Sequence, residues 1–171
     1  MSRDSILHQR GFTIIEILLV IVIMGVFLTL AAPSFVTFTS SQKVKTASFD
    51  LYAAMMFARS EAIKRRKCIS VMSKTGTDWT KPGWSVREVA AANCTPDITD
   101  PALRTQDELS GVVLSGATSV VYRLDGRTTT TSAAGVLIQP QVADSSIKNR
   151  CIRVDATGLP KSTSIDTTTC P

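Results

Sequence analysis

The chain has 171 residues, a formal net charge of +5, four cysteines and one histidine. About 138 residues follow Pro33, which is enough for one hydrophobic core and too few for two ordinary domains. Because the histidine is His8, Ser–His and Cys–His catalytic systems would have no imidazole in the rest of the chain. No Gly-x-x-x-x-Gly-Lys phosphate loop occurs either. We therefore expect a protein that is not an enzyme and that needs no cofactor.

A long apolar run, from Phe12 to Ala32, opens the chain after a short polar leader. As a helix its roughly 21 residues would span about 31 Å, the thickness of a bilayer core. Glu16 lies inside this run, where a charge costs roughly 2.5 kcal/mol at depth and predicts a functional cationic partner. No basic residue follows before Lys43, so a partner within the chain could only be the leader or a newly exposed amine, and we expect another chain to supply the partner. A cleaved secretory signal would be shorter, and a simple anchor would leave Glu16 unexplained.

Charge in the leader predicts the orientation of the chain in a membrane. Arg3, His8 and Arg10 outweigh Asp4, so the positive-inside tendency keeps residues 1–11 in the cytoplasm. The part that follows the apolar run is therefore expected on the opposite side of the membrane.

All four cysteines, Cys68, Cys94, Cys151 and Cys170, lie on that far side, where disulfides persist. Four cysteines allow three pairings, and the sequence alone does not select among them. We expect the nearest-neighbour pairing, Cys68 with Cys94 and Cys151 with Cys170. A metal site is disfavoured because there is no Cys-x-x-Cys and no histidine on this side.

Helical character continues beyond the apolar run, with apolar residues at steps of three and four. The members of this stripe are Val44, Ala47, Leu51, Ala54, Met55, Ala58 and Ala62. Small alanines suit a close approach of a helix to a sheet, so we interpret the stripe as a packing face for the chain's own sheet. A groove for a partner is the alternative.

A basic cluster, Lys64-Arg65-Arg66-Lys67, ends this helical pattern. Cations in a last helical turn are favoured by the helix dipole, by about 0.3 to 1 kcal/mol each. Capping or solvation is therefore the first interpretation of the cluster, and contact with nucleic-acid phosphates is the second.

Alternating side chains and turn signals predict strands after the cluster. They are expected at residues 68–73, 84–89, 112–114, 119–124, 135–139 and 151–154. Trp84 is expected in the core, and residues 90–108 are expected to form a variable surface loop. A helix followed by a mostly antiparallel sheet is an α+β fold.

The residues around the start of the apolar run resemble the type III signal of type IV pilins and pseudopilins. Gly11 stands before the expected cut, Phe12 is the first mature residue, Glu16 is fifth and Pro33 is twenty-second. The resemblance implies cleavage after Gly11 by a prepilin peptidase and N-methylation of Phe12. It also implies that Glu16 meets the Phe12 amine of a neighbouring subunit, and that Pro33 belongs to the assembly segment.

Ala58 to Arg65, followed by a strand and then Gly83 to Val86, resembles the GspH/FimT family of minor pilins and a minor pseudopilin of type II secretion. The resemblance implies a long N-terminal helix packed on two small sheets. The implied divisions are a cleaved leader (1–11), a transmembrane and filament-core helix (12–33), an amphipathic helix (34–67) and a β-rich head (68–171).

The resemblance further implies a structural minor pilin in the complex that primes a type IV pilus, with other minor pilins and the major pilin as partners. The prepilin would lie in the bacterial inner membrane with a periplasmic head, and later in an extracellular pilus.

Some FimT-type members bind DNA through a C-terminal Gly-Arg-x-Arg motif. Here Gly158 is followed by Leu-Pro-Lys, and Gly126-Arg127 lacks the second arginine. DNA uptake through Arg127 and the basic cluster therefore stays an alternative, as does a role in type II secretion.

Overall fold

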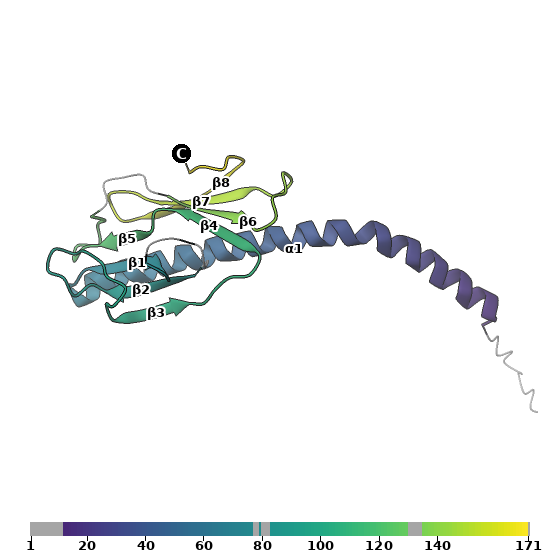
Figure 1. The fold of residues 1–171 in the computed structure, drawn as a ribbon, viewed down its shortest axis with the longest axis horizontal. Coiled ribbons are helices and arrows are strands. Elements are labelled where there is room, and N and C mark those ends of the chain that lie inside the picture. The colour runs from purple at the N-terminus through teal and green to yellow at the C-terminus, as the bar shows by residue number, and fades with distance from the viewer. Residues whose placement is uncertain (1–11, 77–78, 80–82, 130–134, 171) are drawn as a thin grey trace, which may run out of the picture. The chain divides into compact units, whose positions relative to one another are not determined.

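The computed structural model describes residues 12–76, 79, 83–129 and 135–170 (Figure 1). Within these residues one helix, α1 (Ile14–Arg65), precedes eight strands. The strands are β1 (Ile69–Ser73), β2 (Trp84–Glu88), β3 (Ala102–Gln106), β4 (Val112–Gly116), β5 (Ser119–Tyr122), β6 (Val136–Pro140), β7 (Asn149–Val154) and β8 (Pro160–Ile165). The chain divides into two compact units, Met1–Val36 and Thr37–Pro171, and the second is called the head below.

Two antiparallel sheets of four strands make up the β part of the head. Sheet 1 has the order β3-β2-β1-β5, and sheet 2 has the order β4-β6-β7-β8. The chain enters sheet 2 with β4, returns to sheet 1 for β5 and then completes sheet 2. This arrangement confirms the predicted α+β fold, and it confirms the long N-terminal helix with two small sheets that the resemblance implied.

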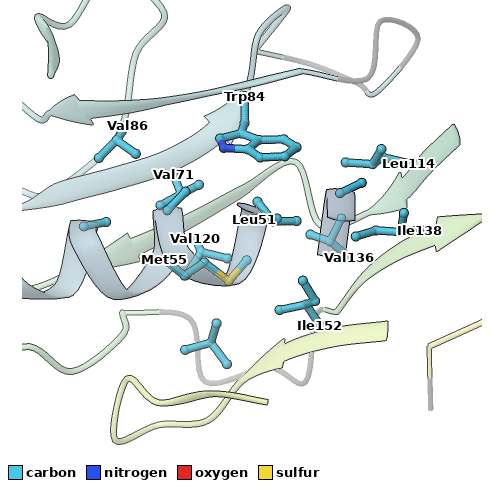
Figure 2. Close-up of a cluster of buried hydrophobic side chains, with 14 of the residues drawn as sticks. Leu51, Met55, Val71, Trp84, Val86, Leu114, Val120, Val136, Ile138 and Ile152 are labelled. Carbon is cyan, nitrogen blue, oxygen red and sulfur yellow. The ribbon is translucent and has the colours of Figure 1, made fainter. Parts of the chain in front are cut away.

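The apolar stripe of α1 is the centre of the core. Its seven members, Val44, Ala47, Leu51, Ala54, Met55, Ala58 and Ala62, are all no more than 2% exposed. Figure 2 shows Leu51 and Met55 of α1 surrounded by side chains of both sheets, among them Trp84 and Val120 of sheet 1 and Ile152 of sheet 2. The interpretation of the stripe as a packing face for the chain's own sheets is confirmed, and Trp84 lies in the core as expected.

Two strands were not predicted, and both lie at sheet edges. The first, β3, lies within residues 90–108, so the prediction of a loop over that whole stretch is wrong. It is the outermost strand of sheet 1 and most of its side chains are exposed. The second, β8, is likewise an edge strand with four consecutive exposed residues. Neither strand buries one face, so neither shows the alternation that marks a half-buried strand.

Disulfides and a buried carboxylate hold the loops of the head. Cys68 is bonded to Cys94 and Cys151 to Cys170, with Cα atoms 5.6 and 5.5 Å apart. This is the nearest-neighbour pairing. The loop that leads to β3 is also held by Asp100, whose carboxylate accepts the backbone N–H groups of Ala90 and Asp97 at 3.1 and 2.8 Å.

Turns from the two sheets meet on α1 at Arg59. Its Nε donates to the carbonyl oxygen of Gly126, in the turn after β5, at 3.1 Å. Its Nη2 donates to the carbonyl oxygen of Thr157, in the β7–β8 hairpin, at 3.4 Å. The two turns also touch one another, because a Cβ atom added to Gly158 would lie 2.0 Å from the Gly126 oxygen. Arg59 thus links the helix to both sheets.

Candidate assembly site

The expected processing segment begins with a helix cap. The backbone N–H of Glu16 donates to Oγ1 of Thr13 at 3.3 Å, and α1 begins at the next residue, Ile14. Thr13-x-x-Glu16 has the spacing of a capping box, in which the threonine accepts hydrogen bonds from the first turn. The carboxylate also lies in the first turn, where the helix dipole stabilises an anion. This local role of Glu16 adds to its expected role in assembly, and the Thr-x-x-Glu pattern is its signal in the sequence.

Around Glu16 the apolar segment has no cover. Phe12 is 81% exposed, Ile14 is 82% exposed, and every side chain from residue 12 to residue 29 is classed as exposed. Within the described residues no ion pair involves Glu16. Gly11 lies outside those residues, and Pro33 lies inside the helical span of α1. Such a surface requires lipid or other apolar helices around it, because so much contiguous apolar area is unfavourable in water.

By length and hydropathy, no single helix within the described residues qualifies as a membrane span. Ile14–Thr29 and Ser34–Arg65 meet these two criteria together, as a bent pair.

Three of the four cations in the basic cluster form ion pairs with carboxylates of the head. Arg65 Nη1 lies 3.0 Å from Oε2 of Glu88, and its Nε also contacts Glu61. Lys64 Nζ lies 3.6 Å from Oε1 of Glu61, and Lys67 pairs with Glu88 on β2. The cluster therefore closes the end of α1 onto sheet 1, which supports the capping interpretation.

The remaining predicted cations lie at chain turns. Arg66 directly follows the last residue of α1. Its φ of 54° is the left-handed conformation that is common at helix ends. Arg127 is exposed in the turn after β5, where its backbone N–H donates to the carboxylate of Asp125 at 3.0 Å. Among the residues that the structure describes, no group of three His, Cys, Asp or Glu side chains is placed to hold a metal ion.

The ion pairs of the cluster predict acid sensitivity of the head. The hydrogen bond from Arg65 lowers the pKa of Glu61, and the hydrogen bonds from Lys67 and Arg65 lower the pKa of Glu88, each below the usual 4.5. When folding lowers the pKa of a carboxyl group, the group stabilises the folded state at pH values above its pKa in the unfolded chain. This contribution is lost as the pH falls through the lowered pKa. The free energy of unfolding of the full-length chain should therefore begin to fall near pH 4.5 and continue to fall below it.

Urea titrations at a series of pH values check this expectation. The Glu88→Gln variant should be less stable than the parent at pH 7 and should lose less stability on acidification. A variant with the same pH dependence as the parent would show that these pairs do not contribute.

Two models of protein families match the chain. The model described as type II transport protein GspH matches residues 47–158, more than half of the chain. The model described as prokaryotic N-terminal methylation motif matches residues 6–32. No curated protein matches the chain.

Solved structures share the fold of the head. The type IV minor pilin FimU of Pseudomonas aeruginosa superposes with a TM-score of 0.61 at 21% identity, covering 78% of this chain and 99% of that one. A second crystal form of FimU gives a TM-score of 0.57, also at 21% identity, covering 74% and 99%. The minor pseudopilin EpsH of the Vibrio cholerae type 2 secretion system gives 0.53 at 11% identity, covering 71% and 97%.

These matches agree with the order of the elements along the chain. The methylation motif covers the cap, Glu16 and the exposed apolar helix as far as residue 32, whereas the GspH model covers residues 47–65 of α1 and both sheets as far as the hairpin turn at Gly158. The chain therefore belongs to the GspH family of minor pilins and pseudopilins of type IV pilus or type II secretion systems, which are structural subunits and not enzymes.

Proposed function

We propose that this chain is a structural minor pilin of a type IV pilus, and that it works with other minor pilins and the major pilin in the complex that starts assembly. The observation that carries the proposal is the uncovered apolar helix with a carboxylate in its first turn. Membrane lipid covers such a helix before assembly, and the helices of other subunits cover it afterwards. The charge of Glu16 needs a cation in both places.

A prepilin peptidase would supply that cation by cutting between Gly11 and Phe12 at the cytoplasmic face of the inner membrane. The new amine of Phe12, once methylated, remains a cation and would pair with Glu16 of a neighbouring subunit. Residues 12–33 would then lie in the filament core, with Pro33 at the end of this segment. The disulfides of the head suit the periplasm and the outside of the cell.

Replacing Glu16 by glutamine tests the proposal. Hydrogen bonds to charged groups contribute about 1.5 to 3 kcal/mol, so docking should weaken by roughly tenfold or more. We expect tenfold fewer surface pili, with the variant accumulating in the membrane at the parent level. Asp50→Asn, which removes a carboxylate elsewhere on α1, is the matched control and should leave piliation unchanged.

Mass spectrometry of the subunit in sheared pili completes the test. The assembled chain should begin with methylated Phe12. Pili that contain the intact leader, or normal piliation by the Glu16→Gln variant, would contradict the proposal.

A role as a minor pseudopilin is the second candidate, and the shared fold with EpsH favours it. Deleting the chain should abolish pili if the first proposal holds, and should abolish secretion while leaving pili intact if the second holds. Uptake of DNA is the weaker alternative, because most of the basic cluster pairs with carboxylates and Gly158 packs against Gly126. Lack of salt-dependent DNA binding by the full-length chain would exclude it.

A further inference from the structure

The loop between β6 and β7, residues 141–148, lies at the end of the head where α1 enters it (Figure 1). Oδ2 of Asp144 accepts a hydrogen bond from Oγ1 of Thr37 at 3.2 Å, and Thr37 is the first residue of the head. Ile147 anchors the other side of the loop, because its side chain is buried in the hydrophobic core. The loop is therefore held against the first turn of α1 in the head.

The tip of this loop, Gln141 to Ala143, is exposed and carries no charge. Val142, at its centre, is 80% exposed. The neighbouring acid, Asp144, is half-buried, and its Oδ1 accepts the backbone N–H and the hydroxyl of Ser146 at 2.9 and 2.6 Å. Hydrogen bonds inside the loop thus hold the carboxylate, and an apolar side chain with uncharged neighbours faces outward.

The distance of this loop from the apolar run indicates what Val142 contacts, since an exposed valine by itself is ordinary. The run ends at Ala32, five residues before Thr37, and α1 is helical throughout this stretch. At 1.5 Å per residue, Thr37 lies at most about 7.5 Å beyond the end of the run, whatever the angle between the two units. The headgroup region of each leaflet is about 5 to 7 Å thick. With the run in a bilayer, Thr37 and the loop beside it would lie at the level of the headgroups.

The composition of α1 around Thr37 agrees with this level. Phe35 is 67% exposed and Phe38 is 59% exposed, so large apolar side chains continue beyond Ala32. The next charged residue along the helix is Lys43. The part of α1 that suits contact with lipid therefore extends as far as the residues beside the loop.

We propose that the tip of the β6–β7 loop inserts Val142 among the phospholipid headgroups of the leaflet on the head's side. This contact rests on the proposed function, which places the apolar helix in the membrane before assembly. It adds a second membrane contact, made by the head itself. Phospholipid is the partner because the covalent link through α1 brings the loop to the membrane surface before any other subunit docks. The contact limits the tilt of the head and is broken when the subunit enters a filament.

Site-specific photocrosslinking of the full-length chain in vesicles of phosphatidylethanolamine and phosphatidylglycerol tests the proposal. A benzophenone amino acid replaces Val142, Val20 of the apolar run, or Leu124. Leu124 is the matched control, because it is 49% exposed and lies in the turn that Arg59 contacts through Gly126. Arg59 is 22 residues after the start of the head, about 33 Å farther along α1. Mass spectrometry should show phospholipid adducts at Val20 and Val142, and at least tenfold fewer at Leu124.

A charge placed on the loop tip gives an independent measurement. Gln141→Glu adds a carboxylate of nearly the same size as the amide, at an exposed position next to Val142. A carboxylate is disfavoured among anionic and apolar lipid groups, so the yield of adducts at Val142 should fall at least twofold. The yield at Val20 should stay unchanged.

The possible outcomes separate this contact from the proposed function. Adducts at Val20, with no more at Val142 than at Leu124, would reject the loop contact and leave the pilin role intact. Crosslinks of Val142 to a second copy of the chain, or an unchanged yield in Gln141→Glu, would also overturn the contact. Absence of adducts at Val20 would reject the membrane placement and the loop contact together. Normal piliation by Glu16→Gln, with phospholipid adducts at Val142, would reject the assembly role alone.

Discussion

Replacing Gly158 by alanine is expected to destabilise the head by at least about 3 kcal/mol, a large part of the stability of an ordinary domain. The added Cβ would lie 2.0 Å from the carbonyl oxygen of Gly126, and this oxygen belongs to the backbone of a second turn. The residue also has φ 82°, which an alanine adopts at a cost of about 1 to 2 kcal/mol. Relief would require separating the two turns, and with them the hydrogen bonds that Arg59 donates to both. Urea titration of the full-length chain in mild detergent, followed by the fluorescence of buried Trp84, measures the loss.

Gly76→Ala is the matched control for the contribution of φ. Gly76 has φ 80°, but its added Cβ would meet no backbone atom, only side-chain atoms of Ile98 at 3.3 and 3.4 Å and of Met72 at 3.7 Å. The expected loss is therefore about 1 to 2 kcal/mol. Equal losses for the two variants would show that the two turns do not depend on their close contact.

Replacing Leu51 by alanine is expected to cost about 3 to 4 kcal/mol, within the range for large-to-small changes in protein cores. Leu51 is fully buried on α1 between the two sheets, as Figure 2 shows, so no single neighbouring strand can move in to fill the space. The same urea titration applies. The midpoint should fall without a large change in the slope of the transition.

Phe49→Ala, two residues away on α1, separates burial from position on the helix. Phe49 is 71% exposed, so the stability of the isolated chain should change by less than about 0.5 kcal/mol. A large loss from Phe49→Ala would mean that the Phe49 side chain packs in the core of the head. A loss of about 1 kcal/mol or less from Leu51→Ala would contradict the central place of that residue.

Periodicity predicted the parts of the fold that have one buried face. The buried stripe of α1 shows its steps of three and four directly in the sequence. The edge strands β3 and β8 were missed because hydrogen bonds to β2 and β7, rather than burial of their own side chains, hold them in the sheets. Hydrogen bonding of this kind leaves no pattern in the sequence.

Contacts between residues that are far apart along the chain could not be predicted from the sequence either. Lys67 and Arg65 share Glu88 because β1 and β2 pair with Ile69 opposite Glu88, a register that the basic cluster does not reveal. Arg59 meets backbone carbonyl groups of Gly126 and Thr157, and any residue type can supply a carbonyl. Gly126 and Gly158 are the local sign of these turns in the sequence, because both residues have positive φ.

The two disulfides also limit how far the head can be stretched. Cys68 and Cys94 are 26 residues apart, and Cys151 and Cys170 are 19 apart. The disulfides therefore keep both intervening segments from extending when the chain is pulled from its ends. At about 3.4 Å per extended residue they withhold roughly 90 and 65 Å of contour length. A subunit under traction would therefore extend by only part of its contour length while both disulfides are intact. A thiol reductant should increase the extension on unfolding of each subunit by about 150 Å.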